Sequence, residues 1–267
     1  MIIVGELINS TRKKIKEAMQ NKDAEYIRDL AIKQDEAGAD FIDVNAGAFV
    51  TEEMENLEWA INEIQGVTKK PLSIDSPRGE AMAMGLKLHK NGKAMFNSIT
   101  RESDRWGQLF SLAVETDAIV LGLCIDDNGI PEKADERVRI ADRIITELTK
   151  AGKNIEDIAI DPLTTPLSVN TTFGLTVIDT IKGVKKNFPE VKLITGLSNI
   201  SYGLPARKQV NRAFMVSCIV NGLDGALIDP LDPVMMSIII ATEALLNKDP
   251  YCGNYLKAYR SGIVVKE

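Results

Sequence analysis

Histidine is almost missing from this sequence of 267 residues, which contains only His89. Zinc and iron sites built from several histidines are therefore excluded. Catalytic triads and dyads that use a histidine base to activate serine or cysteine are excluded for the same reason. His89 stands between Lys87 and Lys90 at the polar end of a predicted helix, so we expect a solvated surface side chain. The chemistry must come from other residue types.

Cysteine and long apolar runs are scarce as well. The three cysteines, Cys124, Cys218 and Cys252, are odd in number and widely spaced, without a CxxC pair. This argues against a disulfide framework and against a zinc knuckle. No apolar run approaches the ~20 residues that span a bilayer, and the first residues enter a strand pattern without a signal sequence. We expect a protein that is neither secreted nor membrane-embedded and that lies in the reducing cytoplasm.

Positive charge is in deficit, with 32 basic against 38 acidic residues and a net charge of −6. No basic stripe with interleaved aromatic residues is present, so nucleic acid is not expected as a partner. No glycine-rich phosphate loop follows a strand. Linkers and low-complexity tracts are missing too, and the length is typical of one α/β barrel of ~250 residues.

Eight short apolar runs, separated by segments long enough for a helix, organise the chain. The predicted strands cover residues 2–8, 41–45, 71–75, 94–99, 118–124, 158–163, 193–198 and 225–229, and the clearest helices cover 23–37, 52–63, 77–89 and 135–150. Gly38 and Gly152 are expected to end two of these helices, and Asp135 to cap the start of one. A βα unit repeated eight times predicts an α/β fold, a (β/α)8 TIM barrel that forms a single domain over residues 1–267.

Each predicted strand ends on polar or acidic side chains. They are Glu6 and Asn9, Asp43 and Asn45, Asp75, Asn97, Asp126, Asp161, Asn199 and Asp229. One such residue can equally well cap the following turn or helix. A barrel, however, gathers all eight strand ends at one mouth, where its chemistry takes place. Because clustered carboxylates repel one another, this mouth is expected to attract hydrogen-bond donors or a cation.

Two kinds of ligand fit such a mouth. The carboxylates available to Mg²⁺ are Asp43, Asp75, Asp161 and Asp229, since this ion prefers oxygen ligands. A flat heterocycle with alternating N–H donors and acceptors fits as well, because a carboxylate accepts two N–H bonds and an amide both donates and accepts. We expect Asp75, Asn97 and Asp161 to form hydrogen bonds with the edge of such a ring. A site without its own nucleophile would act mainly by aligning reactive cofactors.

Six sequence blocks carry a family resemblance. They are Gly5–Asn9 (GELIN), Asp43–Gly47 (DVNAG), Ser73–Ser76 (SIDS), Ala94–Ser98 (AMFNS), Ile160–Leu163 (IDPL) and Gly196–Asn199 (GLSN). In this order, and over essentially the whole chain, they resemble the methyltetrahydrofolate:corrinoid methyltransferases of the pterin-binding TIM-barrel group. Each block alone is a weak signal, whereas the joint match is specific.

The resemblance implies roles for individual residues. The pterin-binding set that it implies is Asp75, Asn97, Asp161, Gly196, Ser198, Asn199 and Arg207. Other possible pocket residues are Glu6, Asn9, Asp43, Asn45 and Ser76. In the family, the residue matching Asn199 reaches N5 of the folate, where its hydrogen bond strengthens as the methyl group leaves, so Asn199 is the expected catalytic residue. Arg207 is expected either to neutralise the folate tail or to orient its loop.

The implied reaction is an SN2 transfer of a methyl group between N5 of 5-methyltetrahydrofolate and the cobalt of a corrinoid. The protein need not supply a nucleophile, which agrees with the missing histidines. The corrinoid-binding motif DxHxxG is incomplete here, because Lys87–Gly92 keeps its His and Gly and lacks its Asp. We therefore expect the corrinoid on a separate protein that docks at the barrel mouth, and no metal bound by this chain. Relatives work in both directions, including the return of methyl groups from compounds such as glycine betaine to tetrahydrofolate.

Two alternatives stay open. A dihydropteroate synthase shares the barrel and the pterin pocket, but its Thr-Pro-Asp loop and its late Ser-Arg-Lys motif are missing here. A pterin-binding protein without turnover would not need Asn199. The last predicted helix, residues 232–246, has a broad apolar surface that is typical of core packing or of a subunit interface. Because members of the group are commonly homodimers, a homodimer is expected.

Overall fold

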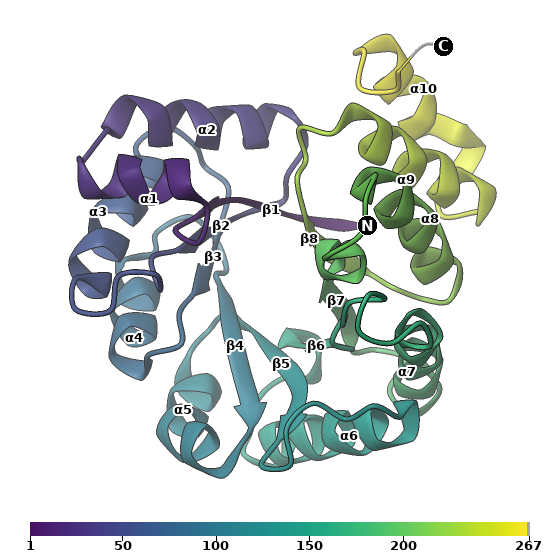
Figure 1. The fold of residues 1–267 in the computed structure, drawn as a ribbon, viewed down its shortest axis with the longest axis horizontal. Helices are drawn as coiled ribbons and strands as arrows, with labels where there is room; N and C mark the ends of the chain where they lie inside the picture. The colour runs from purple at the N-terminus through teal and green to yellow at the C-terminus, as the bar shows by residue number, and fades with distance from the viewer. Residues whose placement is uncertain (266–267) are drawn as a thin grey trace.

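Eight parallel strands close into a barrel in chain order, with β1 paired to β8 (Figure 1). The computed structural model describes residues 1–265. The strands are β1 (Ile2–Asn9), β2 (Phe41–Asn45), β3 (Leu72–Asp75), β4 (Met95–Arg101), β5 (Ile119–Asp126), β6 (Ile158–Asp161), β7 (Lys192–Gly196) and β8 (Gly225–Ile228). They agree with the predicted strands to within a few residues at each end, so the predicted TIM barrel is confirmed.

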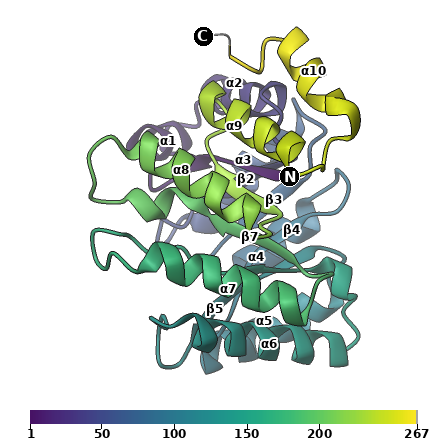
Figure 2. The same cartoon turned by 90° about the vertical axis from the view of Figure 1, so that its right-hand side faces the viewer.

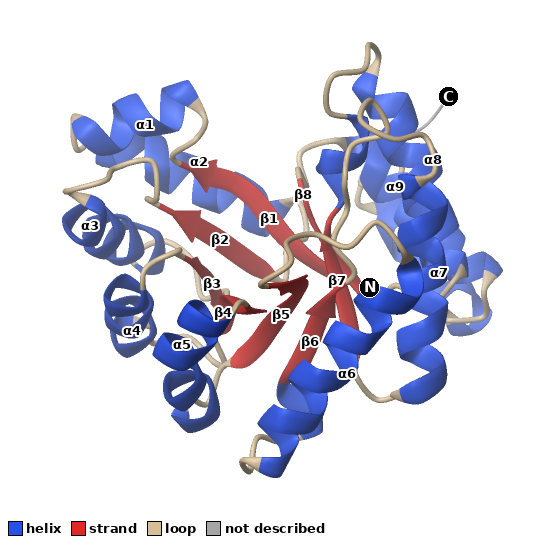
Figure 3. Cartoon of the chain, turned by 60° about the horizontal axis from the view of Figure 1, so that its bottom comes forward, coloured by secondary structure: helices blue, strands red, loops and turns tan. Residues whose placement is uncertain are grey.

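Helices surround the barrel (Figure 3). They are α1 (Lys13–Gln20), α2 (Ala24–Glu36), α3 (Glu53–Gln65), α4 (Gly79–Leu88), α5 (Ser103–Glu115), α6 (Ala134–Lys150), α7 (Phe173–Asn187), α8 (Arg207–Val220), α9 (Pro233–Leu245) and α10 (Gly253–Arg260), with the 3₁₀ turns η1 (Ile155–Asp157), η2 (Leu197–Ser201) and η3 (Pro250–Cys252). Neither α1 nor α10 was anticipated from the sequence. Helix α1 adds a second helix to the first βα unit, and α10 packs on α9 (Figure 2).

The predicted helix boundaries hold with one exception. Gly38 and Gly152 follow α2 and α6 with φ of +95° and +102°, a left-handed conformation that favours glycine at the end of a helix. The prediction that Asp135 caps α6 is wrong. The helix begins one residue earlier, after Lys133, which makes no side-chain cap hydrogen bond. Asp135 lies instead in the first turn, where its negative charge interacts favourably with the positive end of the helix dipole.

The inner faces of the strands change from apolar to polar along the barrel axis. The buried lumen cluster comprises Val4, Phe41, Met95, Ile119, Leu121, Ala159 and Ile194. Side chains two residues apart on a strand share one face, so Asp43 and Asn45 follow Phe41 on the lumen side of β2. Likewise, Asn97 follows Met95 and Asp161 follows Ala159. The apolar residues fill the lower lumen and leave the polar residues at its carboxyl-terminal mouth.

His89 lies far from this mouth, at the carboxyl end of α4. The prediction of a solvated histidine is wrong, because the side chain is half-buried and both ring nitrogens are shielded from solvent. Burial lowers its pKa accordingly. None of the helices in residues 1–265 combines the length and the apolar character that crossing a bilayer requires.

Candidate active site at the barrel mouth

Three neighbouring strands bring Asn45, Asp75 and Asn97 to one level of the mouth. The strand register sets Asn45 beside Asp75 and Asp75 beside Asn97. Asp43 lies one layer deeper on β2, with 1 % of its surface exposed. Its Oδ1 accepts a hydrogen bond from Nδ2 of Asn97 at 3.2 Å. The structure thus brings these four predicted residues together.

Burial shifts the two carboxyl groups of this cluster toward their neutral forms. Desolvation, reinforced by the nearby charge of Asp75, raises the pKa of Asp43 well above its usual range. Desolvation also raises the pKa of Asp75 to about 6, against the opposing effects of the Asn45 amide and the Arg105 guanidinium. A ligand with N–H donors would supply hydrogen bonds that favour the carboxylate form. The cluster is therefore suited to a donor-rich ring edge.

Arg105, on α5, is a site residue that the sequence did not single out. It donates hydrogen bonds from Nη1 to the Pro77 carbonyl at 2.7 Å and from Nη2 to the Ser98 carbonyl at 2.9 Å. It also lines a hollow of about 330 Å³ together with Asn45 and Asp75. The arginine therefore ties the loop after β3 to β4 and places positive charge next to the carboxylates.

Asp161, at the end of β6, is buried and held by three donors. Its Oδ1 accepts from Thr195 Oγ1 and from the Leu163 backbone N–H, both at 2.7 Å. Its Oδ2 accepts only a longer bond, at 3.3 Å, from the Gly196 backbone N–H. Burial is the largest effect on its pKa and raises it, while these hydrogen bonds oppose the shift. The weakly held Oδ2 is the atom with capacity left for a ligand N–H.

A second unpredicted arginine, Arg137 on α6, bonds the backbone that follows Asp161. Its side chain is fully buried, with 0 % exposed, and it donates from Nε to the Pro131 carbonyl at 2.8 Å and from Nη1 to the Pro162 carbonyl at 3.0 Å. Its charge also opposes the rise in the pKa of Asp161. The backbone that follows Asp161 is thereby braced.

The turn η2 places Ser198 and Asn199 just after β7. Ser198 donates from Oγ to Glu6 Oε1 at 3.3 Å. Asn199 is exposed, and a Cβ added at Gly196 would lie 3.6 Å from its Nδ2, so its side chain lies over the end of the strand. Arg207 donates from Nη2 to the Ser198 carbonyl at 2.7 Å. Arg207 needs a contact of this kind if it is to orient the loop. The role of Arg207 at the folate tail stays a prediction.

Glu6 forms one wall of a cavity at the mouth. Its Oε1 accepts a hydrogen bond from Arg12 at 3.0 Å, and burial raises its pKa against the opposing charge of Arg12. The cavity measures about 430 Å³ and is lined by Glu6, Arg12, Ser198, Arg207, Lys208, Asn211, Ile228, Asp229, Asp232 and Met235. Acidic, basic and apolar side chains thus meet next to η2.

Other strand-end residues serve the backbone. Asn9, Asp126 and Asp229 each accept a hydrogen bond from the backbone N–H two residues further on, at 3.0, 2.9 and 2.8 Å. Ser76 Oγ accepts from the Arg78 backbone N–H at 3.1 Å and also donates to Glu53 on α3. These contacts match the capping interpretation of a strand-end residue. The pocket roles of Asn9 and Ser76 stay predictions.

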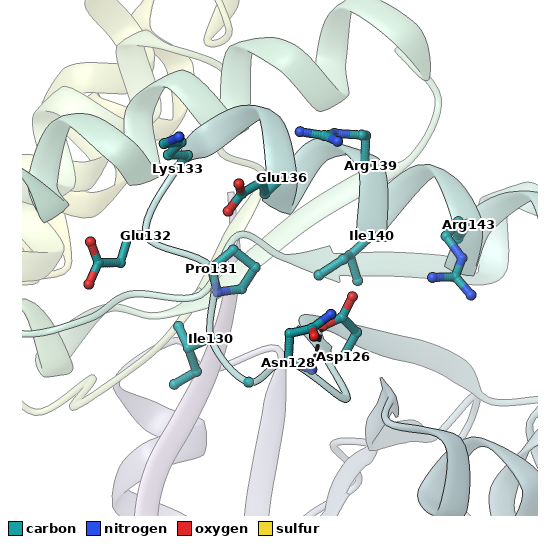
Figure 4. Close-up of a pocket in the computed structure, with 11 residues that line it drawn as sticks. Asp126, Asn128, Ile130, Pro131, Glu132, Lys133, Glu136, Arg139, Ile140 and Arg143 are labelled. Atoms are coloured by element: carbon teal, nitrogen blue, oxygen red, sulfur yellow. Dashed lines mark hydrogen bonds between the residues drawn. The ribbon is translucent and has the colours of Figure 1, made fainter.

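A cavity of about 640 Å³ lies between the β5–α6 loop and the first half of α6 (Figure 4). Its lining combines Asp126 and Glu136 with Arg139 and Arg143. Asp126 caps the loop backbone at Asn128, as the dashed line in Figure 4 shows. This mixed lining favours no single class of ligand, and of its residues only Asp126 belongs to the strand-end pattern.

Metal ligation finds little support in the side-chain arrangement. Within residues 1–265, no group of three or more His, Cys, Asp or Glu side chains is placed to hold a metal ion. Asp43 and Asp75 are close enough for their charges to interact, but Oδ1 of Asp161 already accepts from Thr195 and from the Leu163 backbone N–H. That the chain binds no metal remains a prediction.

Comparison with known proteins identifies the family. Residues 5–229 match the model of the family described as pterin binding enzyme. The chain belongs to this pterin-binding enzyme family. A methylcorrinoid:tetrahydrofolate methyltransferase from Eubacterium limosum is 37 % identical over 264 residues, which cover 98 % of this chain and 97 % of that protein. The resemblance to folate–corrinoid methyltransferases that the six sequence blocks indicated is thus confirmed.

Other similarities are partial or distant. The methionine synthase of Mycobacterium tuberculosis (strain ATCC 25618 / H37Rv) is 30 % identical over 85 % of this chain, but this chain matches only 20 % of its length. Dihydropteroate synthase from Yersinia pestis, solved with a pterine-sulfa conjugate, has a TM-score of 0.68 at 16 % identity, covering 92 % of this chain and 94 % of that one. The Xanthomonas albilineans enzyme in complex with 7,8-dihydropteroate has a TM-score of 0.64 at 17 % identity, covering 92 % of both chains. At such identity these structures show a shared fold alone.

Proposed function

We propose that this pterin-binding enzyme is a methyltransferase that moves a methyl group between N5 of tetrahydrofolate and the cobalt of a corrinoid. The observation that carries the proposal is the similarity to the Eubacterium limosum enzyme over nearly the full length of both chains. The name of that relative gives the direction from methylcorrinoid to tetrahydrofolate. We infer the same physiological direction here.

The pterin is proposed to lie across the mouth with its pyrimidine edge toward Asp75, Asn97 and Asp161. Two of these residues offer carboxylate oxygens and the third offers an amide, which suits a ring edge of N–H donors next to an acceptor. Burial raises the pKa of Asp75, and Oδ2 of Asp161 accepts only one long hydrogen bond. An N–H donor that paired with them would offset their desolvation.

Asn199 is proposed to contact N5. No side-chain hydrogen bond joins Asn199 to any residue that the structure describes, and the side chain is exposed beside Gly196. It is therefore free to bond a ligand atom. A hydrogen bond to N5 strengthens as charge develops there, and a donor that acts mainly in the transition state raises the rate more than the affinity. The corrinoid supplies the cobalt that carries the methyl group.

The folate tail and the partner protein are proposed to share the same face. In the cavity next to η2, Lys208 is paired with Asp232 at 3.5 Å, so Arg207 beside Met235 is the group proposed to meet an aromatic linker that ends in carboxylates. Exposed apolar side chains lie on four of the mouth loops: Val50, Ile130, Val169 and Tyr202. Such residues are common where a protein partner docks. We propose that a separate corrinoid protein docks here.

A homodimer in the cytoplasm is the form we propose. Leu245 on α9 and Tyr251 before α10 are 85 % and 99 % exposed, beside an apolar hollow of about 350 Å³ lined by Ala241, Ala244, Leu245, Cys252 and Tyr255. Apolar surface of this kind is typical of subunit interfaces. All three cysteines are free, which agrees with a reducing compartment.

An anaerobic absorbance assay tests the function. Purified protein is mixed with Co(I) cobalamin and 5-methyltetrahydrofolate, and the loss of Co(I) is followed as methylcobalamin appears; the reverse reaction is followed from methylcobalamin and tetrahydrofolate. We expect conversion in both directions that depends on the enzyme, because a catalyst accelerates a reaction both ways. Folate binding without conversion, even with a cognate corrinoid protein, would show a binding protein instead.

A further inference from the structure

Asp43 has a feature that the proposed pterin contacts do not use. It lies below the mouth on the lumen face of β2, almost fully buried, and it meets Asn97 across the intervening strand β3. The hydrogen bond between them runs from Asn97 Nδ2 to Asp43 Oδ1 at 3.2 Å. A buried carboxyl group on an inner strand face costs folding free energy, so its presence calls for a role.

The contact fixes which end of the Asn97 amide faces the ligand. An amide is planar, and its oxygen and nitrogen diverge from one carbon. Because Nδ2 bonds Asp43, which lies one layer deeper in the lumen, Oδ1 is directed away from Asp43. A carboxyl oxygen accepts this bond in the ionised form, and in the neutral form when the proton sits on the other oxygen. No residue that the structure describes donates to Asn97 Oδ1.

We propose that Asp43 is a positioning residue for substrate binding, which holds Asn97 so that its carbonyl oxygen accepts a hydrogen bond from an N–H of the pterin ring. The proposal rests on the proposed function. Without Asp43, the amide of Asn97 has no fixed orientation, and its inward N–H is left buried without a partner. Asn97 would then offer the ring a donor as readily as an acceptor.

A double-mutant cycle tests the proposal through the affinity for tetrahydrofolate, measured by anaerobic titration. We expect Asp43→Ala to weaken binding by about tenfold, the usual effect of one hydrogen bond. Asp43→Asn keeps an acceptor oxygen and should recover most of the affinity. In an Asn97→Ala background, Asp43→Ala should change the affinity by less than about twofold, because the residue that it positions is gone. An equal loss in both backgrounds, or no loss in either, would overturn the proposal.

A ligand-free measurement separates this proposal from the proposed function. The side-chain amide protons of Asn97 are observed by nitrogen-15 NMR, with thermal unfolding of each variant as a check on folding. We expect slow exchange of these protons in the wild type and fast exchange in Asp43→Ala. If tetrahydrofolate does not bind the wild type, the proposed function fails. Slow exchange without tetrahydrofolate binding would show that Asp43 has a structural role only, which would overturn its role in substrate binding.

Discussion

Replacing Asp75 with asparagine should stabilise the fold while weakening the site. Its pKa of about 6 in the folded protein, against an ordinary value of 3.8, means that folding disfavours the ionised carboxylate by about two pKa units. At 1.36 kcal/mol per unit, the cost is at most ~3 kcal/mol. Asparagine has nearly the same shape without the charge. Asp75→Asn should therefore raise the free energy of unfolding at neutral pH by up to this amount.

The pH dependence gives the sign of the effect. Between pH 3.8 and about 6, the folded protein binds more protons at Asp75 than the unfolded chain does. The free energy of unfolding of the wild type therefore falls, relative to the variant, as the pH rises through this window. The difference is small below the window and constant above it. Urea unfolding of both proteins from about pH 4 to about pH 8 measures it, if the transitions are two-state.

The cost to function is measured on the same samples. The asparagine presents an N–H where the carboxylate accepted one, so the affinity for tetrahydrofolate should fall by about 10- to 100-fold, or ~1 to 3 kcal/mol. Asp126→Asn is the matched control, since Asp126 ends the strand β5 and its amide would still accept the Asn128 backbone N–H. An Asp75→Asn protein that is less stable than the wild type at neutral pH, or that has the same pH slope, would refute the reasoning.

Two further predictions concern a charge and a surface. Arg105→Ala removes a positive charge that lowers the pKa of Asp75, so the pKa of Asp75 should rise. The pH at which half of the tetrahydrofolate affinity is lost should therefore move upward. A titration series in which this pH does not move would exclude the interaction between Arg105 and Asp75. Leu245→Glu should shift the protein from dimer to monomer in sedimentation at micromolar concentration. Leu175→Glu, at another exposed apolar position on α7, is the control and should leave a dimer. A wild type that sediments as a monomer would contradict the homodimer.

The barrel could be predicted from the sequence because the two signals that define it are local. Apolar runs such as Phe41–Asn45 have the length and the polar ending of a barrel strand, and closure then brings all such endings together. Helix α1 was missed because its apolar residues Ile15, Ala18 and Met19 lie in a short segment next to a longer helix. Residues 253–260 gave no clear pattern either, since only Ala258 of α10 is buried.

The site could be predicted only in part, for a related reason. Asp75 and Asp161 were found because each ends a strand, and Asn97 because it follows an apolar run, although β4 continues past it to Arg101. Arg105 and Arg137 each lie on a helix among other charged residues, and only the closed fold brings them against the loops that follow the strands. Which strand-end residues face the ligand and which cap a turn depends on side-chain direction, as the contacts of Asn9 and Ser76 show. A linear pattern does not contain that information.

Asn199 is proposed to assist methyl transfer at a pterin held by the other residues of the mouth. The decisive experiment compares Asn199→Ala with the wild type in two quantities, the single-turnover rate of methyl transfer to Co(I) cobalamin and the dissociation constant of 5-methyltetrahydrofolate. We predict a loss of rate of ~10² to 10³, with a much smaller loss of affinity. Equal losses in rate and affinity, or an unchanged rate, would contradict the account.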